Sequence, residues 1–161
     1  MKRESAKNVV LYYKAVPGMI LLLRREREEL EDAYNSLRGS AVDGLPRGEA
    51  KGKPTEALAV RTAERGIPER MWEIDERIRT LEADAATIRR ALDALGGKYK
   101  QLLTDKLLRE YSWAKIAASM RKPDSTVRYW YRMALDALGK ALEETGAEGS
   151  LECRASRART L

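Results

Sequence analysis

The sequence contains no histidine and a single cysteine, Cys153. One cysteine cannot form a disulfide within the chain. Without histidine, the common zinc sites and the Ser-His and Cys-His catalytic pairs cannot be built. Di-metal sites of helical bundles normally use a Glu-x-x-His pattern, which this chain also lacks. We therefore expect no catalytic site, no bound metal and no cofactor, and we do not expect an enzyme.

Phenylalanine is also missing, and the 5 prolines and 11 glycines are few and clustered. This composition favours an all-α fold. The apolar stretch 19–23 is too short to cross a bilayer, and Arg24 follows it at once. Nothing at the start of the chain resembles a signal peptide. These absences predict a cytoplasmic protein that does not contact a membrane.

The net charge of +6 is unevenly distributed along the chain. Residues 1–95 hold 18 Lys and Arg against 17 Asp and Glu, whereas residues 96–161 hold 13 against 8. The excess positive charge is therefore C-terminal, and it fits a polyanionic partner for that half.

The first half of the chain has helical spacing interrupted by one loop. Pro17 fits the first turn of a helix, and Gly39 is a typical stop signal. Residues 39–53 hold four glycines and one proline with little apolar content, which predicts a mobile loop. The expected elements are helices at 1–15, 17–38 and 54–65, with the loop at 39–53.

The longest pattern runs over residues 68–95, where apolar residues recur at alternating spacings of three and four. This is the a/d stripe of a coiled coil, and Gly96-Gly97 ends it. Trp72 flanks the stripe, where we expect it to pack. The stripe pairs either with the helix at 17–38 or with a second copy in a homodimer, and periodicity does not separate these. Its members are Met71, Ile74, Ile78, Leu81, Ala85, Ile88, Leu92 and Leu95.

The pattern as a whole divides the chain into three parts. Residues 1–96 form a helical hairpin or coiled-coil-like region, and residues 97–145 form a helix-turn-helix domain. After about Thr145 the apolar stripe is lost, which predicts a flexible basic tail at 146–161. Cys153 lies in this tail, and no role is suggested for it.

The helix-turn-helix is expected between about Ser112 and Lys140. Ser112 is a good N-cap for a short helix ending near Met120. Residues 121–123 then break the helix, because Pro123 lacks a backbone donor, and Asp124 or Ser125 can cap the helix that follows. The first helix has Ile116 and Met120 on one face and the small Ala117 at the expected helix crossing.

The second helix has two different faces. Its inner face is marked by Val127, Trp130, Ala134 and Leu138. The opposite face suits base reading in the major groove, which admits one α-helix. The expected base-facing residues are Ser125, Thr126, Arg128, Tyr129 and Arg132, and the expected phosphate contacts are Lys115, Arg121 and Lys122. Between 112 and 140 there are six basic and two acidic residues.

A plainer interpretation competes with DNA binding. Any two helices joined by a proline-containing turn share part of this pattern, and an exposed arginine face is often only solvated. Trp113, at the start of the first helix, either packs on Tyr111 or faces a partner. Packing is favoured because aromatic side chains are usually buried.

The segment resembles the region 4 helix-turn-helix of sigma-70-type factors. The shared pattern is Ile116-Ala117-x-x-Met120, then a turn, then Thr126-Val127, then Ala134-Leu135, and it aligns without a gap. Two departures are visible. Arg121 stands where the turn usually has Gly, which requires a left-handed or rearranged backbone. Lys115 stands where many members have an acidic capping-box residue.

The layout of residues 10–142 also resembles the ArpU/RinA-type phage regulators of Gram-positive prophages. The resemblance is carried by Tyr-Tyr-Lys-Ala-Val-Pro-Gly-Met-Ile at 12–20, the Gly-rich loop, Pro-Thr-Glu-Ala-Leu-Ala at 54–59, the long helix and the terminal motif. It implies a sequence-specific regulator of late or packaging genes that binds double-stranded DNA in a bacterial host cell. Two alternatives stay open, a small terminase-like DNA-packaging subunit and an adaptor that binds RNA polymerase.

Overall fold

The computed structural model describes residues 1–40 and 54–158, with side chains at 1–37 and 66–158. The predicted all-α class is confirmed, because the described residues form α-helices, one π-helical segment and no strand. The chain divides into two compact units. Unit 1 comprises Met1–Pro17 and Glu82–Leu161, and unit 2 comprises Gly18–Leu81. The loop expected at 39–53 lies, from residue 41 onward, outside the described residues.

Two long helices run through both units. The helix α1 spans Arg3–Ser40 and α2 spans Pro54–Asp93, with Pro17 and Pro68 inside them. The predicted breaks near residues 16 and 66 are therefore wrong. A proline inside a helix costs about 3 kcal/mol through its lost hydrogen bond and its steric clash. In α1 the buried positions Val9, Val16 and Leu23 keep a seven-residue spacing across Pro17, so packing favours one continuous helix.

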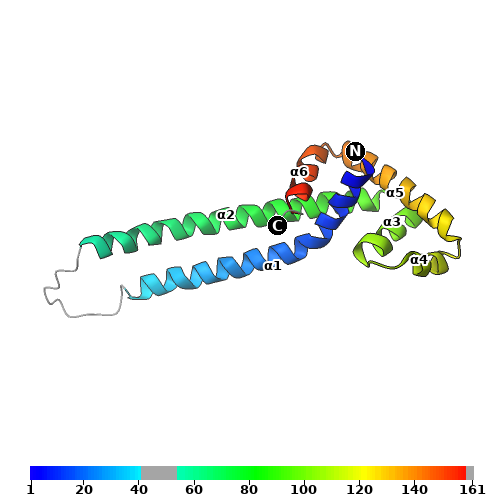
Figure 1. Ribbon diagram of the computed structural model, residues 1–161. Helices are drawn as coiled ribbons and strands as arrows, with labels where there is room; N and C mark the ends of the chain where they lie inside the picture. Colours follow the sequence, from blue (N-terminus) through cyan, green and yellow to red (C-terminus); the bar gives the residue numbers. More distant parts are fainter. Residues whose placement is uncertain (41–53, 159–161) are drawn as a thin grey trace. The chain divides into compact units, whose positions relative to one another are not determined.

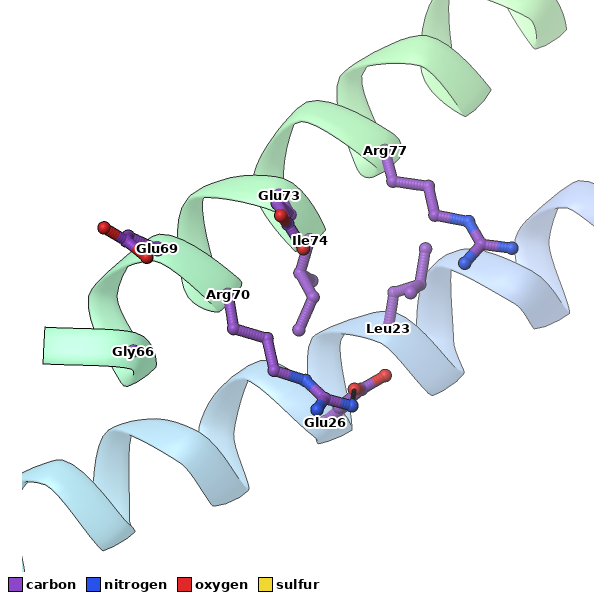
Figure 2. A pocket seen from close by; sticks show the side chains of 8 residues that line it. All are labelled: Leu23, Glu26, Gly66, Glu69, Arg70, Glu73, Ile74 and Arg77. Atoms are coloured by element: carbon purple, nitrogen blue, oxygen red, sulfur yellow. Dashed lines mark hydrogen bonds and ion pairs between the residues drawn. The ribbon is translucent and has the colours of Figure 1, made fainter. Parts of the chain in front are cut away.

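Within unit 2, the a/d stripe of α2 packs against α1. Ile74, Ile78 and Leu81 are buried, and Figure 2 shows Leu23 of α1 extending between the helices towards the side of α2 that carries Ile74. Charged pairs bridge the two helices on either side of this contact. Arg27 Nε donates to Asp75 Oδ1 at 2.9 Å, and Arg70 Nη2 donates to Glu26 Oε1 at 2.9 Å. In unit 2, this part of the stripe therefore packs on α1 of the same chain.

Trp72 does not pack as expected. Its side chain is 63% exposed, because it lies beside the stripe on α2 and not within the row that faces α1. Whether a tryptophan beside the stripe is buried depends on the exact rotation of the helix, because neighbouring positions point in directions about 100° apart. Composition alone does not give this rotation.

One stretch within Arg3–Leu37 of α1 is long and apolar enough to cross a membrane by length and composition alone, with a mean hydropathy of 1.2. This goes beyond the short run at 19–23, because the buried positions near the start of α1 add to it. Core helices of globular proteins meet the same criterion. In unit 1 the start of α1 packs as such a helix, with Val9 and Val10 fully buried.

Unit 1 continues after α2 with a set of shorter helices. They are α3 (Gly97–Leu103), the π-helix η1 (Thr104–Leu108), α4 (Trp113–Met120), α5 (Asp124–Glu144) and α6 (Glu148–Ala158). The flexible tail predicted at 146–161 is therefore wrong over most of its length. Leu151 and Ala155 lie four residues apart on α6 and are both buried, so one short apolar face is enough to hold this helix against the unit. Cys153 is exposed on the same helix.

The predicted boundary at residue 96 does not match the division of the structure, because the ends of α1 and α2 share unit 1 with the helix-turn-helix. Asp84 of α2 accounts for part of this. Its buried carboxylate accepts a hydrogen bond from Tyr12 at 2.8 Å and two from Arg154 at 2.6 Å. Asp84 thus ties α2 to α1 and α6. The stripe predicted Ala85 on the inner face, but Ala85 is half-buried and Asp84 is the buried residue.

Candidate nucleic-acid interface

The first helix of the motif begins as predicted. Ser112 is the N-cap of α4, and its Oγ accepts a hydrogen bond from the backbone N–H of Lys115 at 3.3 Å. Ile116 is fully buried and forms a small core with Leu102 of α3 and Val127 of α5. This core holds α4 and α5 together, and Figure 1 shows the two helices joined by a short turn.

The turn between the helices has the left-handed residue that the sequence required. Arg121 has φ 49° and ψ 44°. Its N–H donates to the Ala118 carbonyl at 3.2 Å, and the Lys122 N–H donates to the Ala117 carbonyl at 3.1 Å. These two bonds form a Schellman motif, which usually has Gly at this position because a Cβ strains the left-handed conformation. The turn is therefore formed in spite of Arg121.

The start of α5 differs from the prediction. Pro123 is the N-cap, with φ −57° and ψ 147°, and no side chain caps the helix. Asp124 and Ser125 were expected to do so. Asp124 is instead the first helical residue, and its carboxylate accepts a hydrogen bond from Arg128 Nε at 2.6 Å. The fixed φ of Pro123 sets the direction of the chain into the helix without a side-chain cap.

The inner face of α5 is confirmed. Val127, Ala134 and Leu138 are buried, and Trp130 packs half-buried against the small core. Leu135, which was placed only in the family pattern, is buried as well. The C-terminal half of α5 also carries the buried Leu142, so this helix belongs to the body of unit 1 as well as to the motif.

The outer face of the motif faces solvent, as predicted. All but one of the residues expected to meet bases or phosphates are exposed. The exception is Thr126, which is half-buried and lies at the edge of the face. The exposed residues are Lys115, Arg121, Lys122, Ser125, Arg128, Tyr129 and Arg132.

Aromatic rings fix the position of α4 on α5. Trp113 contacts Tyr131 edge to face, with ring centroids 5.2 Å apart. Packing is therefore confirmed for Trp113, although its partner is Tyr131 and not Tyr111. The guanidinium of Arg128 lies 5.2 Å from the centroid of the Trp113 ring, and Lys115 Nζ lies 3.4 Å from that of Tyr111. Two exposed cations of the motif thus rest on aromatic faces, an attractive arrangement.

The charges of the motif are paired unequally. Asp124 pairs with Arg128, and Asp136 pairs with Arg3 of α1, whose hydrogen bonds lower the pKa of the Asp136 carboxyl. These are the two acidic residues between 112 and 140. Within the part of the chain that the structure describes, five exposed cations of the motif have no carboxylate partner: Lys115, Arg121, Lys122, Arg132 and Lys140.

The two units also differ in net charge. Unit 1 carries 19 Lys and Arg against 12 Asp and Glu, whereas unit 2 carries 12 against 13. The positive charge that the sequence placed in the C-terminal half therefore belongs to the unit that contains the motif. An excess of positive charge in the unit that carries the motif is one of the features expected of a nucleic-acid-binding domain.

A hollow lies in unit 2, between α1 and α2 (Figure 2). It opens where Gly66 has no side chain, and most of its walls are charged. Arg70 crosses it and pairs with Glu26, while Leu23 and Ile74 form its floor. Among the described residues, no buried side-chain nitrogen or oxygen lacks a partner.

Sequence reasoning missed the segment that leads into the motif. The π-helix η1 ends at Leu108, and Glu110 then takes a left-handed conformation with φ 57°. Lys14 of α1 donates to Glu110 at 2.7 Å, and this hydrogen bond lowers the pKa of the Glu110 carboxyl. No local signal marks a π-helix, because its extra residue is held by surrounding packing.

No group of His, Cys, Asp and Glu in the described residues is arranged to hold a metal ion. Comparisons with protein-family models, with curated proteins and with solved structures find no match to this chain.

Proposed function

We propose that this protein binds specific sequences of double-stranded DNA through α4, α5 and the turn between them, and that it regulates transcription. The observation that carries the proposal is the charge pairing of the motif. Both of its acidic residues are neutralised by arginines, while five exposed cations have no carboxylate partner in the described part of the chain. A merely solvated helix pair has no reason to separate its charges in this way.

The geometry suits the major groove. In helix-turn-helix proteins the N-terminal residues of the second helix contact base edges. Here Ser125, Arg128, Tyr129 and Arg132 line the exposed side of the first turns of α5. Lys115, Arg121 and Lys122 flank this row from α4 and the turn. They would neutralise phosphates, which supplies affinity but no sequence preference.

The start of α5 adds to this surface. Its N-cap is a proline without a side-chain hydrogen bond to the helix, so the backbone N–H groups of the first turn have no side-chain cap. Such N–H groups, together with the helix dipole, favour a bound anion. A DNA phosphate next to Lys122 would accept hydrogen bonds from these N–H groups.

The resemblance to sigma region 4 and to ArpU/RinA-type regulators narrows the biological role. It supports the control of late or packaging genes of a phage or prophage, in the cytoplasm of a bacterial host. RNA polymerase is a second partner that the resemblance implies. The packing of Ile74, Ile78 and Leu81 within unit 2 favours pairing of this part of the stripe within one chain over pairing between two copies.

Binding of the purified chain to a selected duplex tests the assignment of the two residue sets. Arg128→Ala with Arg132→Ala should remove most of the preference for the selected site over random DNA, because each good base contact is worth about 1–3 kcal/mol. Lys122→Ala should weaken binding to both duplexes equally. Lys140→Ala, which removes the same charge farther along α5, is the control and should keep the preference. An unchanged preference in the double variant would contradict the recognition face.

Capture of fragments from the genome that encodes the protein tests the biological role. Enrichment upstream of a late or packaging operon is the expected result. Enrichment without relation to those genes, with a ring of many subunits in light scattering, would instead favour a packaging subunit. The absence of salt-dependent DNA binding would contradict the proposal and favour an adaptor.

A further inference from the structure

Asp124, in the first turn of α5, holds the side chain of Arg128 in a defined orientation. Arg128 Nε donates to Asp124 Oδ2 at 2.6 Å, four residues earlier on the same helix, and the two side chains are 51% and 47% exposed. Among the described residues, no hydrogen bond or ion pair uses either Nη group of Arg128. The Nε–H of the guanidinium is therefore occupied, and both of its Nη amino groups are free to donate.

The ring of Trp113 limits the same guanidinium from a second side. The carbon at the centre of the guanidinium lies 5.2 Å from the centroid of this ring. The ring itself is held edge to face by Tyr131 and contacted by Lys106 Nζ at 4.7 Å. Arg132, one turn later on the same face, has neither restraint in the described structure. Arg128 is thus the restrained arginine of the base-facing row.

This restraint has little value for the fold. Exposed ion pairs four residues apart on a helix add little stability, since water screens them. An acidic side chain on a DNA-facing surface is also unfavourable for affinity, because it repels phosphates. A carboxylate in the first turn of a helix interacts favourably with the helix dipole, but this interaction does not require a hydrogen bond to a base-facing arginine. The pairing of Asp124 with Arg128 therefore needs another reason.

We propose that Asp124 is a positioning residue that presets Arg128 to read a guanine in the major groove, a proposal that rests on the DNA-binding function above. With Nε held by Asp124, the two Nη groups form a pair of parallel donors. Guanine offers two acceptors there, N7 and O6, which this pair matches. Adenine offers N7 beside the N6 amino group, a donor, so it meets one Nη group with like polarity. Holding the fork in advance reduces the side-chain freedom lost on binding.

The test measures base preference and total affinity separately. The full chain first selects its preferred duplex from a random library. Binding is then measured to that duplex and to versions in which each G·C pair is replaced in turn by A·T. At one guanine, the wild-type chain should lose about 10-fold or more in affinity, the discrimination expected of a bidentate arginine contact. Asp124→Asn should reduce this loss to about 2- to 3-fold, because an amide holds the guanidinium less strongly than a carboxylate does.

Two further variants complete the experiment. Arg128→Lys should reduce the preference at the same guanine, since lysine keeps the charge but lacks the planar fork that Asp124 holds in place. Glu144→Gln removes the same negative charge as Asp124→Asn from the far end of α5 and should leave the preference at its wild-type value. Thermal melting should show that each variant is folded, because all three positions are exposed. Asp124→Asn should melt slightly lower than the wild type, since a carboxylate in the first turn interacts favourably with the helix dipole.

Three results would overturn the proposal. One is a uniform rise in affinity for all duplexes in Asp124→Asn with every base preference kept, which would make Asp124 a simple charge. Another is a selected site in which no guanine replacement causes a loss of affinity that depends on Arg128. The third is a wild-type chain that binds no duplex at low salt, and that result, unlike the first two, would also refute the DNA-binding function.

Discussion

Replacing Arg121 by glycine should change stability and DNA binding in opposite directions. Arg121 holds φ 49° and ψ 44° in the turn between α4 and α5. A residue with a Cβ pays about 1–2 kcal/mol for this conformation. Glycine pays nothing for it, but loses more backbone freedom on folding, which offsets about 0.5–1 kcal/mol. We expect Arg121→Gly to stabilise the fold by about 0.5–1 kcal/mol.

The same substitution should weaken DNA binding. The side chain of Arg121 is exposed at the turn and has no carboxylate partner in the described structure. If it contacts a phosphate, its loss should lower affinity for all duplexes equally. The slope of log affinity against log salt should become shallower by about 0.9, the value for one phosphate contact.

Thermal unfolding and fluorescence titration across a salt series measure the two effects. Unit 1 comprises 97 residues, and for a unit of this size the gain in stability should raise the unfolding temperature by about 2–8 °C. Arg121→Ala is the matched control, because alanine removes the charge but keeps the Cβ. It should lose the same DNA affinity without the gain in stability. A glycine variant that is less stable than the alanine variant would refute the left-handed turn.

Two further predictions concern the buried carboxylate of Asp84. Arg154→Ala should destabilise the protein by about 2 kcal/mol, less than a fully buried pair because the Arg154 side chain is 36% exposed, and a urea midpoint that barely moves would argue against the network. Burial, followed by the hydrogen bond to Asp84, raises the pKa of Tyr12 above its ordinary value. The neutral hydroxyl is thus favoured in the folded state, so stability should be complete below about pH 10 and fall as the pH rises further. Tyr12→Phe should lose about 1 kcal/mol at neutral pH but show a shallower alkaline decline, and an identical decline in both proteins would contradict this.

Local signals predicted the motif well. Ser112 caps a helix through its own side chain, Pro123 sets the backbone before the next helix, and the apolar spacing of α5 marks the buried face at Val127. Each of these effects acts within a few residues, so the sequence contains all that is needed. The left-handed Arg121 followed in the same way, since a family position usually occupied by Gly still has to make the turn.

Long-range packing explains what the sequence did not reveal. A proline is a local signal for a helix boundary, but the buried face of α1 continues past Pro17 and overrides it. The tail was expected to be flexible because its apolar content is low, yet Leu151 of α6 is buried and Arg154 pairs with the buried Asp84, far away in sequence. Such pairings between distant segments leave no periodic pattern along the chain.

In the candidate site too, local spacing predicted some features, while contacts between helices could not be predicted. Which residues face outward on α5 followed from helical spacing, and the residues expected to face bases are exposed except Thr126, which is half-buried. The pairing of Arg128 with Asp124 lies at ordinary helical spacing, but Trp113 reaches the same guanidinium from another helix. That contact required the three-dimensional structure.

The central claim is that the exposed cations of α4 and the turn bind DNA phosphates. The most direct measurement is a salt titration of binding between the full chain and a double-stranded duplex. The wild-type slope of log affinity against log salt should be at least as steep as about −2.7, for three phosphate contacts. Replacing Lys115, Arg121 and Lys122 by alanine should flatten this slope by about the same amount. A triple variant with the wild-type slope, or a wild-type chain that does not bind the duplex at low salt, would contradict the account.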